Sequence, residues 1–172
     1  MRPCLLFSIC SAVLFAESVA GVKWTPPAAW KSTGTTSMRA ATYPVAPAPG
    51  DKEGAECAVY FFGSGQGGSV QANVDRWEGQ FKAPGGKPAP AKVNKIDVHG
   101  LPVTTIDVSG EYSGMAGPGA SPVLVTGYRL LGAIIEGPGG NVFIKFTGPA
   151  KTMAANQSKF QQLLDSFEKA GK

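Results

Sequence analysis

The sequence predicts an α+β fold, a three-layer α/β/α sandwich in which two amphipathic helices cover the two faces of a mainly antiparallel sheet. Three observations lead to this prediction. Most of the β-rich segments are joined in pairs by turn residues, as in hairpins. Ser69–Phe81 and a second segment beginning at Pro149 instead repeat apolar residues at helical spacing. Because each helix has one apolar face, each must bury that face against the sheet.

The N-terminal residues have the composition of a secretory signal peptide. Met1-Arg2-Pro3 precedes an apolar run from Cys4 to Phe15, and small residues follow at Ser18 and Ala20. The apolar run is shorter than the roughly 20 residues that span a bilayer. The alternative is a buried N-terminal strand or helix. We expect a signal peptide over residues 1–20, cleavage after Ala20, and a periplasmic or secreted protein.

Residues 21–172 are long enough for a single domain with a substantial core. Of the three cysteines, only Cys57 lies outside the predicted signal peptide, so the mature chain has no internal disulfide and Cys57 is expected to be buried. The net charge is +4, but the lysines are scattered and no aromatic residues interleave with them. This pattern argues against a nucleic-acid partner.

The segment from Glu56 to Phe81 organises the predicted domain. Glu56–Phe62 is a β-rich run expected to form a central strand, Gly63–Gly68 is a glycine-rich loop, and Ser69–Phe81 is the first helix, with Ser69 as a plausible N-cap. The apolar stripe of this helix consists of Val70, Val74, Trp77 and Phe81.

A polar edge runs along one flank of that stripe. At about 100° per residue, Asn73, Arg76 and Gln80 lie together on it. We expect these three residues to face a partner, with the predicted loop at Ser109–Pro122 nearby. The alternative is that Arg76 only ties the helix to a neighbouring loop through hydrogen bonds.

The other elements follow from turn residues and β-rich composition. His99-Gly100 is a two-residue hairpin signal. The expected elements are a short strand and turn within Gly21–Lys31, strands at Met38–Val45, Lys92–Val98, Leu101–Val108, Val123–Glu136 and Val142–Thr147, a long loop at Ser109–Pro122, and a C-terminal helix that starts at Pro149.

The glycine-rich loop matches GxGxxG between a strand and a helix. A proline- and glycine-rich loop and a hairpin follow it, whereas a dinucleotide site requires a crossover to a parallel strand. The backbone amides at the start of the helix could still hold an anion, so Gly65, Gly67, Gly68 and Ser69 form a candidate anion site. The alternative is a flexible turn without a ligand.

The sequence shows no catalytic set, metal site or cofactor motif. His99 is the only histidine and falls in a predicted turn, and outside the signal peptide it is accompanied by the single Cys57, which is too few ligands for zinc. A small hydrolase centred on His99 is therefore the least favoured function.

Two phrases indicate a family. Asn73–Phe81 (NVDRWEGQF) and Val142–Thr152 (VFIKFTGPAKT), together with Met38–Ala41 (MRAA), resemble a group of uncharacterised exported bacterial proteins. The order of elements resembles the PsbP-like fold. Members of that fold are typically non-enzymatic accessory or binding modules, and the resemblance implies the same class of role here.

The sequence therefore favours an exported non-enzymatic binding or accessory module that docks on a protein or envelope partner through Asn73, Arg76 and Gln80. The main alternative is a small-ligand or anion binder that uses the glycine-rich loop at residues 63–69. No transmembrane segment is expected in the mature chain.

Overall fold

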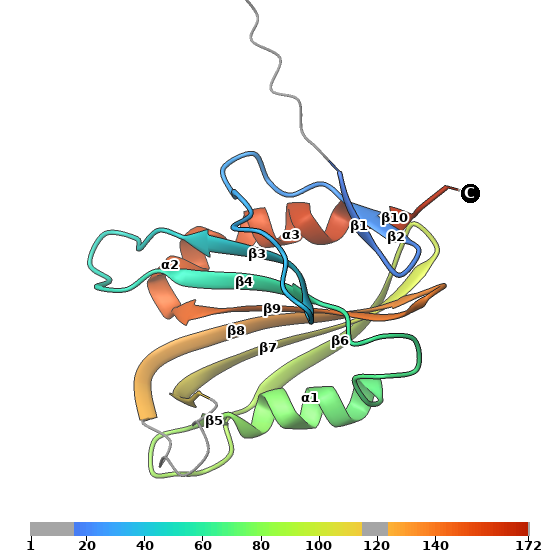
Figure 1. Cartoon of the computed structure of the whole chain (residues 1–172). Coiled ribbons are helices and arrows are strands. Elements are labelled where there is room, and N and C mark those ends of the chain that lie inside the picture. The colour runs from blue at the N-terminus through green and yellow to red at the C-terminus, as the bar shows by residue number, and fades with distance from the viewer. Residues whose placement is uncertain (1–15, 115–123, 172) are drawn as a thin grey trace, which may run out of the picture.

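The computed structural model describes residues 16–114 and 124–171, which form a large antiparallel sheet, a small second sheet and three helices (Figure 1). The strands are β1 (Glu17–Val19), β2 (Val22–Trp24), β3 (Arg39–Val45), β4 (Ala55–Tyr60), β5 (Phe81–Lys82), β6 (Ala91–Val98), β7 (Leu101–Ser113), β8 (Leu124–Gly137), β9 (Gly140–Pro149) and β10 (Glu168–Lys169). The helices are α1 (Val70–Gly79), α2 (Ala150–Ala155) and α3 (Gln157–Asp165).

The large sheet has the strand order β3-β4-β9-β8-β7-β5, and β6 also pairs with β7. The small sheet has the order β1-β2-β10. Every strand pairing among the described residues is antiparallel. The predicted α+β class with a mainly antiparallel sheet is therefore confirmed. No helix within residues 16–114 and 124–171 has both the length and the apolar character needed to cross a bilayer.

Apolar side chains of the large sheet divide between two hydrophobic clusters. On β9, Val142, Ile144 and Phe146 belong to the cluster that includes residues of α2 and α3, whereas Phe143 belongs to the cluster with Trp77 of α1. Side chains along a strand alternate between its faces, so the two clusters lie on opposite faces of the sheet. Figure 1 accordingly shows α1 on one side of the sheet and α2 and α3 on the other.

Helix α1 begins where the sequence predicts. Ser69 is its N-cap, and the Ser69 hydroxyl oxygen accepts a hydrogen bond from the Ala72 backbone N–H at 3.1 Å. Trp77 is buried on the sheet side of the helix, as its position in the apolar stripe predicts. The helix ends earlier than predicted, because Phe81 leaves it to pair with Tyr112 as part of β5. Sheet pairing thus overrides the helical period over the last residues of the predicted helix.

Two further predictions are wrong in detail. Ser109 belongs to β7 and not to a loop, because β7 stays paired with β8 as far as Ser113, which lies opposite Leu124. The rest of the predicted loop, residues 115–123, lies outside the described residues. The C-terminal helix is divided into α2 and α3 at Asn156, whose φ of −117° departs from helical geometry.

The expected cleavage bond after Ala20 lies in a tight turn between β1 and β2, where Ala20 and Gly21 have φ values of 54° and 74°. The Tyr43 hydroxyl donates a hydrogen bond to Glu17 Oε2 of β1 at 2.6 Å. Cleavage after Ala20 would detach β1 and leave β2 paired with β10. The first fifteen residues of the expected signal peptide lie outside the described residues.

Other sequence predictions are confirmed near the core. Cys57 is fully buried in β4, as its sequence context predicts. His99 and Gly100 form the turn between β6 and β7 with φ values of 50° and 76°, as a two-residue hairpin requires.

The contact between α1 and the sheet depends on a glycine in β8. A Cβ added at Gly132 would lie 2.6 Å from Trp77 Cζ3 and 2.8 Å from Ile106 Cγ2. We expect Gly132→Ala to lower the free energy of unfolding by about 1–3 kcal/mol, because both neighbours are buried and the core is closely packed. Urea unfolding measures this change.

The matched control is Gly79→Ala at the last residue of α1, where an added Cβ meets no atom within 4 Å. Alanine is the better helix former, so this substitution should stabilise the protein by up to about 1 kcal/mol. Equal effects of the two substitutions would contradict the close approach of α1 to the sheet.

Candidate functional site

The glycine-rich loop before α1 is shaped by close packing. Gly65, Gly67 and Gly68 all have positive φ. A Cβ added at Gly67 would lie 2.7 Å from Phe143 Cε2 and 2.8 Å from Phe62 Cδ2. These contacts explain the glycine at position 67 without any ligand. The Ser69 hydroxyl is engaged in capping α1. Anion binding by this loop therefore stays a prediction that rests on the sequence pattern.

The Asn73 side chain is bonded within the protein and does not face solvent. It is fully buried, and its Nδ2 donates to the carbonyl oxygens of Gly67 (2.8 Å) and Ser69 (2.9 Å). Its Oδ1 accepts a hydrogen bond from Arg76 Nη2. Asn73 thus ties the loop to the helix and cannot face a partner in this conformation. The hydrogen bond from Arg76 agrees with the alternative that this residue links the helix to the loop region.

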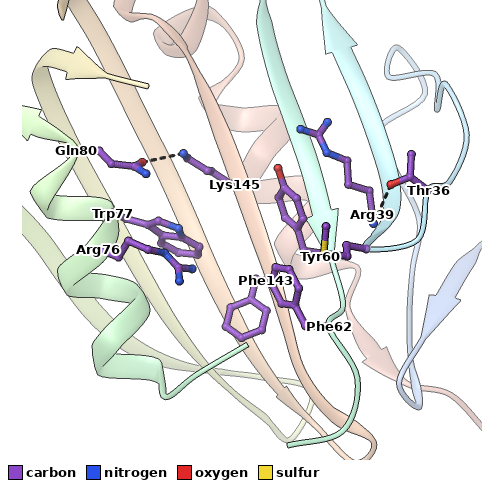
Figure 2. A pocket seen from close by; sticks show the side chains of 10 residues that line it. Thr36, Arg39, Tyr60, Phe62, Arg76, Trp77, Gln80, Phe143 and Lys145 are labelled. Carbon is purple, nitrogen blue, oxygen red and sulfur yellow. Dashed lines mark hydrogen bonds between the residues drawn. The ribbon is translucent and has the colours of Figure 1, made fainter. Parts of the chain in front are cut away.

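Arg76 and Gln80 line a cavity of about 370 Å³ between α1 and the sheet (Figure 2). The cavity is formed by α1 on one side, by β9 at its floor, and by the end of β4 and the segment leading into β3 on the other side. Its lining residues are Thr36, Met38, Arg39, Tyr60, Phe62, Arg76, Trp77, Gln80, Phe143 and Lys145.

Lys145 enters this cavity from β9, the strand between β4 and β8. Ile144 and Phe146 point to the opposite face, so strand alternation directs Lys145 toward α1. Its Nζ donates to Gln80 Oε1 at 2.8 Å and to Tyr112 Oη at 3.1 Å (Figure 2 draws the first of these). Both acceptors are uncharged oxygen atoms at ordinary pH.

Within the part of the chain that the structure describes, no carboxylate pairs with the Lys145 ammonium. Among the described residues, neither Lys145 nor Arg76 forms a salt bridge. The pKa of Lys145 is lowered from 10.5 to about 8, chiefly by burial and also by the nearby charge of Arg76, whereas Glu56 partly opposes the shift. The cavity therefore contains a cation that the protein itself solvates poorly.

Arg39 differs from these two cations because it is paired. Its Nη1 donates to Glu56 Oε1 at 2.8 Å, and its guanidinium lies 5.2 Å from the centroid of the Tyr60 ring. This pair contributes little net charge to the cavity. It holds Tyr60 at the cavity wall through a cation–π contact.

Aromatic rings form most of the remaining wall. The rings of Tyr60 and Phe62 stack with centroids 5.9 Å apart, and Phe62 contacts Phe143 at 5.5 Å. Trp77 of α1 also lines the cavity. These rings make one part of the cavity apolar, while Lys145 and Gln80 make another part polar (Figure 2).

The other chemistry-bearing residues lie elsewhere. His99 is in the β6–β7 turn, where its Nδ1 is 2.9 Å from the Phe167 carbonyl oxygen, and it does not line the cavity. Residues 16–114 and 124–171 contain no group of three or more His, Cys, Asp or Glu side chains placed to hold a metal ion.

Two of the three residues that the sequence singles out as a partner edge, Arg76 and Gln80, line this cavity, whereas Lys145 and the aromatic wall are not predicted from the sequence. A signal was present, because Lys145 shares its strand face with Phe143 while Ile144 and Phe146 make the other face apolar, and a strand that is apolar on both faces is expected to be covered on both. The wall could not be recognised, because Tyr60 and Phe143 belong to different strands that only the sheet brings together.

No protein-family model and no curated protein sequence matches this chain. Solved structures of similar fold include the following two. A Pseudomonas aeruginosa protein of unknown function is 14% identical with a TM-score of 0.50, covering 92% of this chain and 99% of its own. The cyanobacterial PsbP (CyanoP) from Synechocystis is 10% identical with a TM-score of 0.50, covering 96% and 98%. These similarities support a PsbP-like fold.

Lys145 should make stability depend on pH in a defined window. Between about pH 8 and pH 10.5 the unfolded chain keeps a Lys145 proton that the folded chain has released, so this residue's contribution to stability rises with pH. Below pH 8 the buried ammonium destabilises the fold by about 3 kcal/mol. Lys145→Met removes the buried charge but also removes the two hydrogen bonds of Lys145 Nζ. We therefore expect a net stabilisation of about 1–3 kcal/mol at pH 7.

The measurement is urea unfolding of both proteins at several pH values from 7 to 10. The stability difference should shrink as pH rises through about 8, because the wild type loses its buried charge. Lys92→Met, at an exposed position on β6, is the control and should leave the pH dependence unchanged. A constant difference across this range would contradict the buried, unpaired state of Lys145.

Proposed function

We propose that this protein is an exported, non-enzymatic binding module and that its binding site is the cavity between α1 and strands β3, β4 and β9. The observation that carries this proposal is the unpaired Lys145 ammonium. It lies in an aromatic-lined cavity and is held by the neutral oxygens of Gln80 and Tyr112. A ligand that supplies the missing negative charge would complete this site.

The energetic argument is that packing does not require a lysine here. The lowered pKa corresponds to about 3 kcal/mol of stability lost at pH 7. An apolar side chain at position 145 would occupy the same strand position without this loss. Residues that reduce stability while pointing into a concave site are typical of functional positions.

The composition of the cavity supports binding. Its volume lies within the range of about 300–1,000 Å³ typical of small-molecule sites, and its apolar walls are combined with a few polar groups. Arg76 is exposed at the cavity, where it adds positive potential that attracts an anion. The sequence-based expectation for Arg76 and Gln80 is retained in this proposal, and Asn73 is left out.

The finer description of fold and location also belongs to the proposal. The two hydrophobic clusters support a three-layer α/β/α sandwich of the PsbP-like type. The composition of residues 1–20 supports export. The mass of the protein recovered from the cells that produce it tests export: a chain that begins at Gly21 is expected, and a chain that retains residues 1–20 contradicts it.

A thermal-shift screen tests the binding function. The panel contains carboxylates, phosphates, alcohols, amines and sugars, each with and without an aromatic body. At least one compound should raise the melting temperature of the wild-type protein, because ligand binding to the folded state stabilises it. The same compound should not raise that of Lys145→Met, although this variant starts from a higher melting temperature.

Lys92→Met should respond as the wild type does, because position 92 lies outside the cavity. If no compound in the panel stabilises the wild type, the cavity is not a small-ligand site. If a compound stabilises wild type and Lys145→Met equally, it binds elsewhere, and the proposal is contradicted for that compound.

A further inference from the structure

This inference concerns the class of ligand and rests on the proposed function. The first step is the charge inside the cavity. Arg39 is neutralised by Glu56, so Lys145 and Arg76 carry the uncompensated positive charge. An ammonium has three N–H donors, and Lys145 Nζ makes two hydrogen bonds within the described residues. One donor remains for a ligand.

The second step is how much negative charge the cavity can accept. Gln80 is the C-cap of α1, and it accepts the Lys145 hydrogen bond. The C-terminal end of a helix carries a partial negative charge of about half an elementary charge, which offsets part of the two positive charges. About 1.5 positive charges then remain. They compensate a singly charged carboxylate fully, whereas a doubly charged phosphate would bring excess negative charge, with its larger desolvation cost, into a partly apolar cavity.

The third step is the shape of the apolar part. Tyr60 and Phe62 stack nearly parallel, with an interplanar angle of 10°, and Trp77 faces the same cavity from α1. Figure 2 shows Phe62 and Phe143 at one end of the cavity and Lys145 and Gln80 at the other. A ligand with an apolar body and a charged head would satisfy both ends at once. The volume of about 370 Å³ restricts it to a small molecule.

We propose that the cavity binds a small organic carboxylate with an apolar body. The Lys145 ammonium binds the carboxylate, Arg76 adds positive potential, and the body lies among Trp77, Tyr60 and Phe62. Thr36 and Met38 lie at the exposed side of the cavity, which leaves an entrance for a small molecule.

Isothermal titration calorimetry at pH 7 tests this inference with matched probes. 4-Phenylbutyrate has both the body and the carboxylate, 4-phenyl-1-butanol has the body alone, acetate has the charge alone, and phenyl phosphate has a doubly charged head. We expect 4-phenylbutyrate to bind at least about tenfold more tightly than each of the others, because a charged hydrogen bond and apolar burial both contribute.

Variants locate the binding site. Lys145→Met should weaken 4-phenylbutyrate binding about tenfold or more, Lys145→Arg should retain part of it, and Lys92→Met should leave it unchanged. Because Lys145 loses its proton near pH 8, the affinity of the wild type should fall between pH 7 and pH 9.5. A merely structural role of Lys145 would not produce this pH dependence in binding.

The contrary outcomes are distinct. Equal binding of 4-phenyl-1-butanol, or tightest binding of phenyl phosphate, overturns the carboxylate class while the cavity remains a binding site. Unchanged affinity in Lys145→Met overturns the assignment of the head group to Lys145. Absence of binding by all four probes overturns this inference, and the proposed function is then decided separately by the thermal-shift panel.

Discussion

The structure depends on a strand that is covered on both faces. β9 lies between β4 and β8, and its alternating side chains enter the hydrophobic clusters on both sides of the sheet. Such a strand must supply apolar residues in both directions. Ile144 and Phe146 do so toward α3, and Phe143 does so toward α1. Lys145 is the charged exception to this rule on the α1 side of β9, and it lines the cavity.

The surroundings of Lys145 explain how the fold tolerates it. α1 provides an oxygen acceptor from Gln80, and β7 provides another from Tyr112. Neither group removes the charge, so the ammonium remains desolvated and its pKa is lowered. Under the proposed function, an anion would find the site preorganised, because the cation and its aromatic walls are already held in place.

Several features of the fold follow from local patterns and could be predicted. The capping serine at position 69, the buried face of α1 and the hairpin turn at His99-Gly100 depend on neighbouring residues alone. The errors occur where a distant segment decides the outcome. Phe81 leaves the helical period because it pairs with Tyr112, and Ser109 is in a strand because β8 extends beside it.

The sequence by itself determined the α+β class, the antiparallel pairing and the polar edge that contains Arg76 and Gln80, because these depend on periodicity and turn chemistry. Only the tertiary structure decided that Asn73 is buried, and that Lys145 meets Gln80 beneath aromatic residues from two strands and a helix. The physical reason is that a cavity is defined by side chains far apart in the chain. Their distances are set by the order of strands that are distant in the chain, such as β4 beside β9, and no local pattern specifies that order.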